Sequence, residues 1–301
     1  MLVWRIAMKF KKISLVTVAT LGLLVAGCSN GEDNNASMEE KLNYTINGIE
    51  PGSGTMLLAN QALQDYENLN NWRLTESSTA AMLGELDKAF SNEEPIIFTG
   101  WNPHWMFAKY DLKYLDDPKK ALGDIEQINT IVRKGFDQDF PNAYTIVDRF
   151  YWTSEDMESV MTDAQSSSFS EAAEKWVAEQ SDKISEWTVD VERGNGEKIE
   201  LISTPWETED ASSHVMQAIL EQHGFEVEIT PVDPAIMFQA IATGSGDVSL
   251  APWLPITHGS FYEKHKDDFI DLGENLEGAR IGFVVPTYMD VDSIEDLKAK
   301  E

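Results

Sequence analysis

The sequence has little cysteine and little basic charge, and each shortage excludes a class of protein. Cys28 is the only cysteine among 301 residues, so no disulfide within the chain can stabilise the fold. Lysine and arginine number 23 against 52 aspartates and glutamates. Nucleic acid is therefore not an expected partner, because phosphate binding needs clustered basic residues. We interpret the acidic excess as a solvated surface.

Motifs of catalysis are also missing. The histidines show no metal-ligand spacing, and neither an HExxH pattern nor a GxSxG turn occurs. No GxxxxGK[ST] loop is present, so this chain is not expected to bind ATP through such a loop. We therefore expect a protein that is not an enzyme and that holds no metal or cofactor.

The amino-terminal residues predict export. Four basic residues precede the apolar run Ile13–Ala26, which is followed by Gly27 and Cys28. This order is typical of a secretory signal peptide and not of a spanning helix. The end of the run resembles the lipobox of bacterial lipoproteins, which implies cleavage before Cys28 and attachment of lipid to it. We expect a signal peptide in residues 1–27, from either Met1 or Met8, then a lipidated cysteine and flexible tether in residues 28–41, and a location on the outer face of the cell membrane.

Two parts of the chain repeat the order strand, helix, strand, helix, strand. In the first part we expect strands at 44–49, 72–75 and 95–99 with helices at 56–66 and around Met82, Leu86 and Ala89. In the second we expect strands at 198–203, 225–230 and 248–251, with helices that begin at Ser212 or Ser213 and span 234–243. Such alternation predicts an α/β protein with parallel sheets, which bind ligands beyond the carboxyl ends of their strands.

Two further strand-like runs, 128–133 and 279–285, are interpreted as segments that cross between two lobes. They divide the chain into one lobe of residues 42–127 plus 286–301 and another of residues 128–285. The last residues begin a helix with a capping box at Ser293 and Asp296.

Several long motifs indicate a known family. They are GIEPGSGTM (48–56), TGWNPHWMFAKYDLKYLDDPKK (99–120), VRKGF (132–136), APWLPITH (251–258) and VPTYMDVDSIEDLK (285–298). With these motifs the chain resembles the glycine betaine-binding proteins of osmoprotectant ABC importers. The resemblance implies a two-lobe, type II periplasmic-binding-protein-like clamp in a circularly permuted chain order. It also implies partners in the permease and ATPase subunits of an ABC transporter.

Three tryptophans are the candidates for an ammonium-binding cage. Trp101, Trp206 and Trp253 each follow a predicted strand, at the end where a ligand would bind. Glycine betaine carries a trimethylammonium group without an N–H, so aromatic faces suit it better than hydrogen-bond acceptors do. The resemblance places the family's tryptophan prism at the same three positions.

The carboxylate of such a ligand needs hydrogen-bond donors. The glycine-rich turn before Met56 can offer backbone N–H groups at a helix start. The resemblance implies that Gly54, Thr55 and His258 bind the carboxylate. The role of His104, which occupies the matching place in the first repeat, stays open.

Other ligands and functions fit parts of this pattern. The same clamp could take choline, carnitine, proline betaine or a sulfur analogue, although choline has no carboxylate for Gly54 and His258 to bind. A surface-anchored sensor or hydrolase on a similar two-lobe fold is the alternative from a different class.

Overall fold

The computed structural model describes residues 36–300, and the contacts group Ser37–Glu301 as one unit. The predicted signal peptide and Cys28 lie outside the described residues. In the described part of the chain, no helix is both long and apolar enough to cross a membrane.

Both predicted repeats form parallel strands. The first repeat consists of β1 (Thr45–Asn47), α2 (Gly54–Asp65), β2 (Arg73–Thr75), α3 (Thr79–Asn92) and β3 (Phe98–Asn102). Its first strand lies between the other two and is parallel to both. The second repeat consists of β6 (Lys198–Ser203), α10 (Glu207–Gln222), β7 (Glu226–Pro231), α11 (Pro234–Thr243) and β8 (Val248–Ser249), and β6 is again central and parallel to its neighbours. The α/β class with parallel strands is confirmed.

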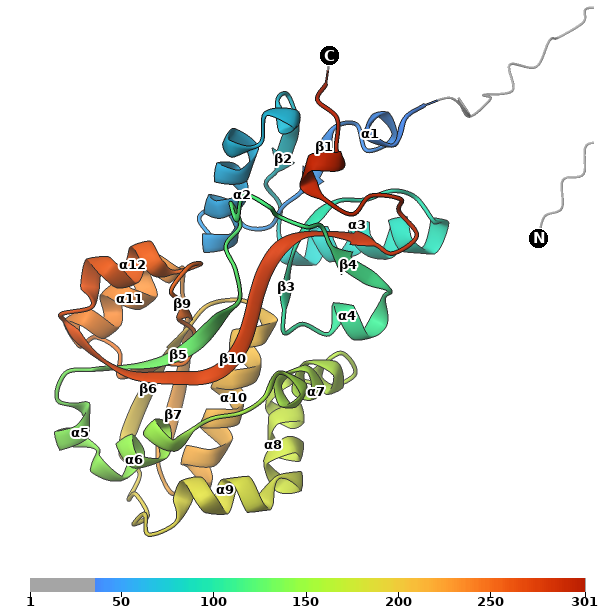
Figure 1. Cartoon of the computed structure of the whole chain (residues 1–301). Helices are drawn as coiled ribbons and strands as arrows, with labels where there is room; N and C mark the ends of the chain where they lie inside the picture. Colours follow the sequence, from blue (N-terminus) through green and yellow to red (C-terminus); the bar gives the residue numbers. More distant parts are fainter. Residues whose placement is uncertain (1–35, 301) are drawn as a thin grey trace, which may run out of the picture. The chain divides into compact units, whose positions relative to one another are not determined.

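A long curved strand, β10 (Phe269–Pro286), joins the two sets of strands (Figure 1). Its first part pairs antiparallel with β5 (Glu126–Arg133), and its second part pairs antiparallel with β3 and β4 (Leu112–Tyr114). The pairing places Ile281 opposite Trp101. We call β1–β4 the first sheet and β5–β9 the second sheet, with β10 shared between them.

Short elements and a group of helices complete the unit. They are α1 (Met38–Lys41), η1 (Glu67–Leu69), α4 (Met106–Lys109), α5 (Phe136–Asp139), α6 (Pro141–Arg149), α7 (Ser154–Ala164), α8 (Phe169–Glu179), α9 (Ser181–Thr188), β9 (Trp253–Leu254), α12 (Gly259–His265) and η2 (Ile294–Asp296). Helices α7 and α8 pack against α10 and each other. Trp152, Trp176 and Trp187 pack among these helices and belong to the largest apolar core.

The two ends of the unit meet in a separate core. Leu42, Trp72, Ile294 and Leu297 share it, and the Trp72 indole donates a hydrogen bond of 2.9 Å to the carbonyl of Lys298. The capping box that begins at Ser293 is present, but the helix ends after the single 3-10 turn η2. Helix α1, at the start of the unit, and η2, at its end, contact the same core. The two ends of the unit therefore lie close together, as expected for a circularly permuted chain order.

Three elements, α10, β3 and β10, begin at least three residues away from their predicted starts. Helix α10 begins at Glu207 with Trp206 as its N-cap, so Ser212 and Ser213 lie inside the helix and do not cap it. Strand β3 begins later than predicted and includes Trp101. Strand β10 begins at Phe269, ten residues before the predicted start at Ala279. Glycines with positive φ and β-bulges interrupt this strand without ending it, and they made its first part look like a loop in the sequence.

Candidate functional site

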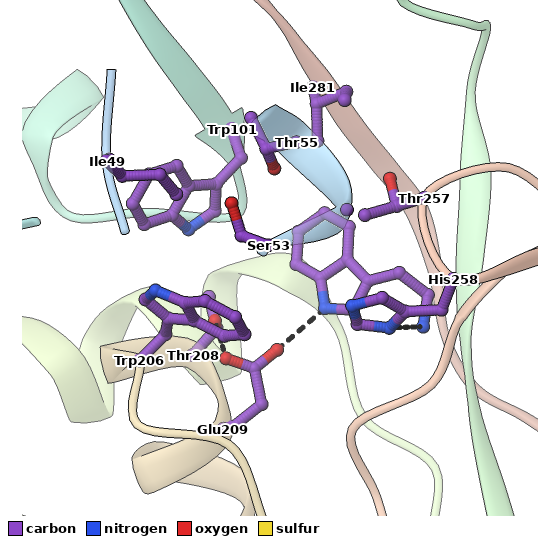
Figure 2. A pocket seen from close by; sticks show the side chains of 12 residues that line it. Ile49, Ser53, Thr55, Trp101, Trp206, Thr208, Glu209, Thr257, His258 and Ile281 are labelled. Carbon is purple, nitrogen blue, oxygen red and sulfur yellow. Dashed lines mark hydrogen bonds between the residues drawn. The ribbon is translucent and has the colours of Figure 1, made fainter. Parts of the chain in front are cut away.

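A pocket lies where chain segments of the first and second sheets face each other (Figure 2). The space between its walls, part of it open to solvent, is about 350 Å³. Its walls are Ile49, Ser53, Gly54, Thr55, Trp101, Trp206, Thr208, Glu209, Trp253, Thr257, His258 and Ile281. All six residues that the sequence predicts for ligand binding are therefore brought together, and the pocket joins the two repeats.

The three predicted tryptophans come from three different elements. Trp101 lies in β3, Trp206 caps α10 and Trp253 lies in the short strand β9, so only Trp206 is in a loop as expected. Trp101 and Trp253 are each 4% exposed. Both residues are therefore almost completely covered by protein, although both line the pocket.

Two carboxylates hold two of the indoles by their N–H groups. Trp206 Nε1 donates to Glu50 of the first repeat at 3.1 Å, and Trp253 Nε1 donates to Glu209 at 2.7 Å. Glu50 also accepts hydrogen bonds from the N–H and hydroxyl of Thr79. Burial pushes the pKa of Glu50 up, but these hydrogen bonds outweigh it and leave the pKa lowered. These hydrogen bonds fix the Nε1 edges of the two indoles at the pocket wall.

Helix α2 begins at the pocket wall. The Ser53 hydroxyl caps it by accepting a hydrogen bond from Met56 N at 3.2 Å. The N–H groups of Gly54 and Thr55 belong to the first turn, where no carbonyl of the helix can accept them. Free N–H groups at a helix N-terminus attract anions, and here they belong to residues that line the pocket.

His258 provides a neutral donor beside this helix start. Its Nδ1 accepts a hydrogen bond from the backbone N–H of Trp253 at 3.0 Å, so the ring proton belongs on Nε2. Burial lowers the pKa of His258 to about 4, against a smaller opposing effect of the Ala251 backbone. The imidazole is therefore uncharged at neutral pH and can donate from Nε2.

A buried acid fixes the loop that carries His258. Glu126 accepts hydrogen bonds from the backbone N–H groups of Ile256 at 3.1 Å and Thr257 at 3.0 Å, and from the Thr257 hydroxyl. Burial raises the pKa of Glu126, although the same hydrogen bonds act in the opposite direction. The loop thereby presents the Thr257 carbonyl to the start of α2.

A second set of contacts links the sheets beside the pocket. Glu207 accepts hydrogen bonds from Trp105 Nε1 at 2.6 Å and from Gln165 Nε2 at 3.0 Å. His104 Nε2 lies 2.9 Å from the same carboxylate, without the alignment of a hydrogen bond. Burial would raise the pKa of Glu207, but His104 and the hydrogen bonds leave it lowered. His104 thus contacts the rim of the site and does not line the pocket.

Half of the pocket wall was not predicted from the sequence. The missed residues are Ile49, Ser53, Thr208, Glu209, Thr257 and Ile281. Glu209 was not expected in the pocket wall. It belongs to an acidic first helical turn, together with Glu207 and Asp210, and such a turn suggests a solvated helix start. In the structure it is buried.

Among residues 36–300, no group of three or more histidine, cysteine or acidic side chains is arranged to hold a metal.

Two β-α-β repeats, with a pocket where they face each other, define an α/β ligand-binding protein. The chain belongs to the family described as the substrate binding domain of ABC-type glycine betaine transport systems, whose family model matches residues 27–179 and 197–301. It is thus a substrate-binding component of an ABC transport system, as its motifs predict.

A curated relative supports this membership. The glycine betaine/carnitine transport binding protein GbuC of Listeria monocytogenes is 44% identical over 296 residues, which cover 95% of this chain and 99% of the relative. Because the alignment runs through nearly all of both proteins, they share one chain order.

Two solved structures match parts of the chain. Lactococcal OpuAC, in its closed-liganded conformation complexed with glycine betaine, is 48% identical over 48% of this chain and 58% of its own, with a TM-score of 0.47. The glycine betaine/L-proline-binding protein ProX of Borrelia burgdorferi is 32% identical over 50% of this chain and 58% of its own, with a TM-score of 0.48. Both matched regions span less than two thirds of those structures.

Proposed function

We propose that this protein captures glycine betaine, or a related quaternary ammonium solute, outside the cell and delivers it to the permease and ATPase subunits of an ABC transporter. The observation that supports the proposal is the meeting of three indoles, a helix N-terminus and a neutral histidine in one pocket. This set of groups matches a zwitterion with a methylated cation at one end and a carboxylate at the other.

The cation is assigned to Trp101, Trp206 and Trp253. Each ring that faces a quaternary ammonium contributes about 0.5–2 kcal/mol of cation-π attraction, more where water is excluded. Three rings together supply about 1.5–6 kcal/mol, a substantial part of the roughly 8 kcal/mol of net binding free energy that micromolar affinity requires. The methyl groups gain apolar contact with the same rings.

The carboxylate is assigned to Gly54, Thr55 and His258. Two backbone N–H groups at the start of α2 and the Nε2–H of a neutral histidine can hydrogen-bond an anion without bringing a compensating charge into the pocket. The side chain of Thr55 adds a hydroxyl close to the same N–H groups.

Closure of two lobes around the solute is the proposed mechanism. We assign one lobe to residues 42–127 plus 286–301 and the other to residues 128–285. Trp101, Gly54 and Thr55 then belong to one lobe, and Trp206, Trp253 and His258 to the other, so the solute bridges both. A ligand can favour the closed state only through contacts that exist in that state.

Chemistry on the solute is not part of the proposal. The acids nearest the indoles, Glu50 and Glu209, accept hydrogen bonds from tryptophan N–H groups. Glycine betaine has no bond whose cleavage these groups would assist. We therefore propose that the protein is a carrier and not an enzyme.

Calorimetric titration of residues 29–301 with a panel of solutes tests the proposed function. The panel contains glycine betaine, carnitine, proline betaine, choline and a sulfonium analogue. We expect binding of the zwitterions and weaker binding of choline, which offers the α2 N-terminus no carboxylate. Carnitine is the second candidate, because the name of the Listeria relative includes it. Failure of every quaternary ammonium to bind would contradict the proposal.

Substitution of His258 by alanine is expected to weaken glycine betaine binding more than choline binding. The reason is that only glycine betaine has a carboxylate to accept the Nε2–H. The measurement is the ratio of the two dissociation constants in the wild-type protein and in His258→Ala. An equal loss for both ligands would mean that the histidine supports the pocket without bonding the carboxylate.

Substitution of Cys28 by serine is expected to release the protein into the medium. We propose that the lipid on Cys28 anchors the mature protein. The tether is the stretch between Cys28 and α1 and is shorter than the predicted 28–41, because Met38–Lys41 form a capped helix. Serine offers no thiol for acylation. Fractionation of cells that express either form gives the measurement. Retention of Cys28→Ser in the membrane fraction would show that something other than this lipid holds the protein there.

A further inference from the structure

One acid in the pocket wall has no role in the proposed binding of the cation and the carboxylate. Glu209 lies in the first turn of α10, three residues after Trp206, and is 3% exposed. It lines the pocket together with Trp206 and Trp253, two members of the cage, and accepts the indole N–H of Trp253; Figure 2 shows its side chain beside Trp206. A cation held by these rings would therefore lie beside a carboxyl group that solvent scarcely reaches.

The hydrogen bonds of Glu209 allow it to gain or lose a proton without rearrangement. Oε1 accepts the indole N–H of Trp253 at 2.7 Å, and an indole can only donate, so Oε1 is an acceptor in either state. Oε2 is bonded to the Thr208 hydroxyl. A hydroxyl can donate to a carboxylate or accept from a carboxylic acid, so the proton belongs on Oε2 in the neutral form.

The charge of Glu209 depends on its surroundings. Burial raises its pKa to about 7, despite the opposing hydrogen bonds from Thr208 and Trp253. A substantial share of the protein therefore holds the neutral acid at neutral pH when no ligand is bound. A fixed positive charge nearby favours the ionised form, because the low-dielectric surroundings strengthen the attraction.

We propose that Glu209 is the residue by which the pocket distinguishes a cationic solute from a neutral one of the same shape. It positions the Trp253 ring in both states and loses its proton when a quaternary ammonium enters. The O–H bond at Oε2 breaks, its electron pair stays on the carboxylate, and the proton passes to solvent; the solute is unchanged. This inference rests on the proposed function and specifies its ligand class.

Other titratable groups surround the pocket and have to be separated from Glu209. They are Glu50, His104, Glu126, Glu207, Asp210 and His258. Hydrogen bonds outweigh burial and lower the pKa of Glu50 and Glu207, while burial keeps His258 neutral. Burial raises the pKa of Glu126 and of Asp210, so proton release by itself does not identify the group. A variant is needed for the assignment.

Proton release can be measured on the wild-type protein. Calorimetric titrations with glycine betaine in two buffers of different ionisation enthalpy give the number of protons exchanged on binding. We expect release that is largest near pH 7 and an affinity that rises with pH through this range. The carbon isostere 3,3-dimethylbutanoate has the same shape and carboxylate without the cation, and we expect it to release no proton. Equal or absent release for both ligands would overturn the inference.

Glu209→Gln identifies the group that loses the proton. Glutamine can accept the Trp253 N–H through its oxygen and donate to Thr208, so the geometry is kept while the charge is removed. We expect proton release to disappear and glycine betaine to bind at least about tenfold more weakly, with little change for 3,3-dimethylbutanoate. Glu221→Gln, an exposed position at the far end of α10, is the matched control and should behave as wild type.

The outcomes distinguish this inference from the function on which it rests. If the wild-type protein binds no quaternary ammonium, the proposed function fails and the inference fails with it. If glycine betaine binds and Glu209→Gln keeps both the proton release and the ratio of affinities for the two ligands, only the inference is overturned.

Discussion

Gly54→Ala is expected to weaken glycine betaine binding by about 100-fold or more while the protein stays folded. A Cβ atom at this position would lie 2.2 Å from the carbonyl oxygen of Thr257 and 2.7 Å from its Cγ2. Atoms cannot approach so closely, so the start of α2 and the loop that carries His258 must move apart. The proposed carboxylate donors come from both, and they would no longer converge on one ligand.

The clash involves a contact across the pocket and leaves α2 itself able to form. Alanine is a better helix former than glycine, and Gly54 is the first residue of α2. We therefore expect the melting temperature of the ligand-free protein to be kept or slightly raised. Gly84→Ala is the matched control: Gly84 lies within α3 and a Cβ there would meet nothing within 4 Å. It should gain about 0.5–1 kcal/mol of stability and bind betaine as before.

Titration calorimetry for affinity and thermal denaturation for stability give the two measurements. Unchanged betaine affinity in Gly54→Ala would mean that the ligand binds without the approach of α2 to Thr257. The carboxylate assignment would then have to be abandoned, even if the tryptophans still bind the cation.

The architecture was predictable because its signals are local. The helix at 234–243 and the strand at 198–203 have the predicted bounds, since the first begins at Pro234 and ends before Gly244, and the second is a continuous run of strand-forming residues. The three tryptophans could be found because each stands near the end of a predicted strand. Parallel strands then bring those ends together, which places residues far apart in the sequence around one pocket.

The errors arise where tertiary contacts decide. Ser213 has the residue type of a helix cap, yet its hydroxyl bonds to Ser203 of β6 inside the protein, and acidic residues begin α10 a turn and a half earlier. Gly273 and Gly278 have φ near +92° and +83°, which is typical of strand ends, but pairing with β5 continues past both. The buried Glu209 accepts a hydrogen bond from Trp253 of β9, which is distant in the sequence. No local pattern contains that information.

Trp253→Ala is expected to weaken glycine betaine binding by at least about tenfold. The variant loses one cation-π contact of about 0.5–2 kcal/mol and the apolar contact of the ring with the methyl groups. It also leaves Glu209 without its indole donor. Affinity measured by calorimetry, and circular dichroism to confirm that the fold is intact, test this expectation.

Because Trp253 is 4% exposed and belongs to the main core, its removal also costs stability. Trp206→Ala provides the comparison, since Trp206 is only partly buried and outside that core. If both residues face the cation, each variant should lose more affinity for glycine betaine than for 3,3-dimethylbutanoate, because only glycine betaine has a charge for the indole to attract. A loss that is the same for both ligands would show that the tryptophans shape the pocket without binding the ammonium group. The cation would then depend on Glu209 and not on the rings.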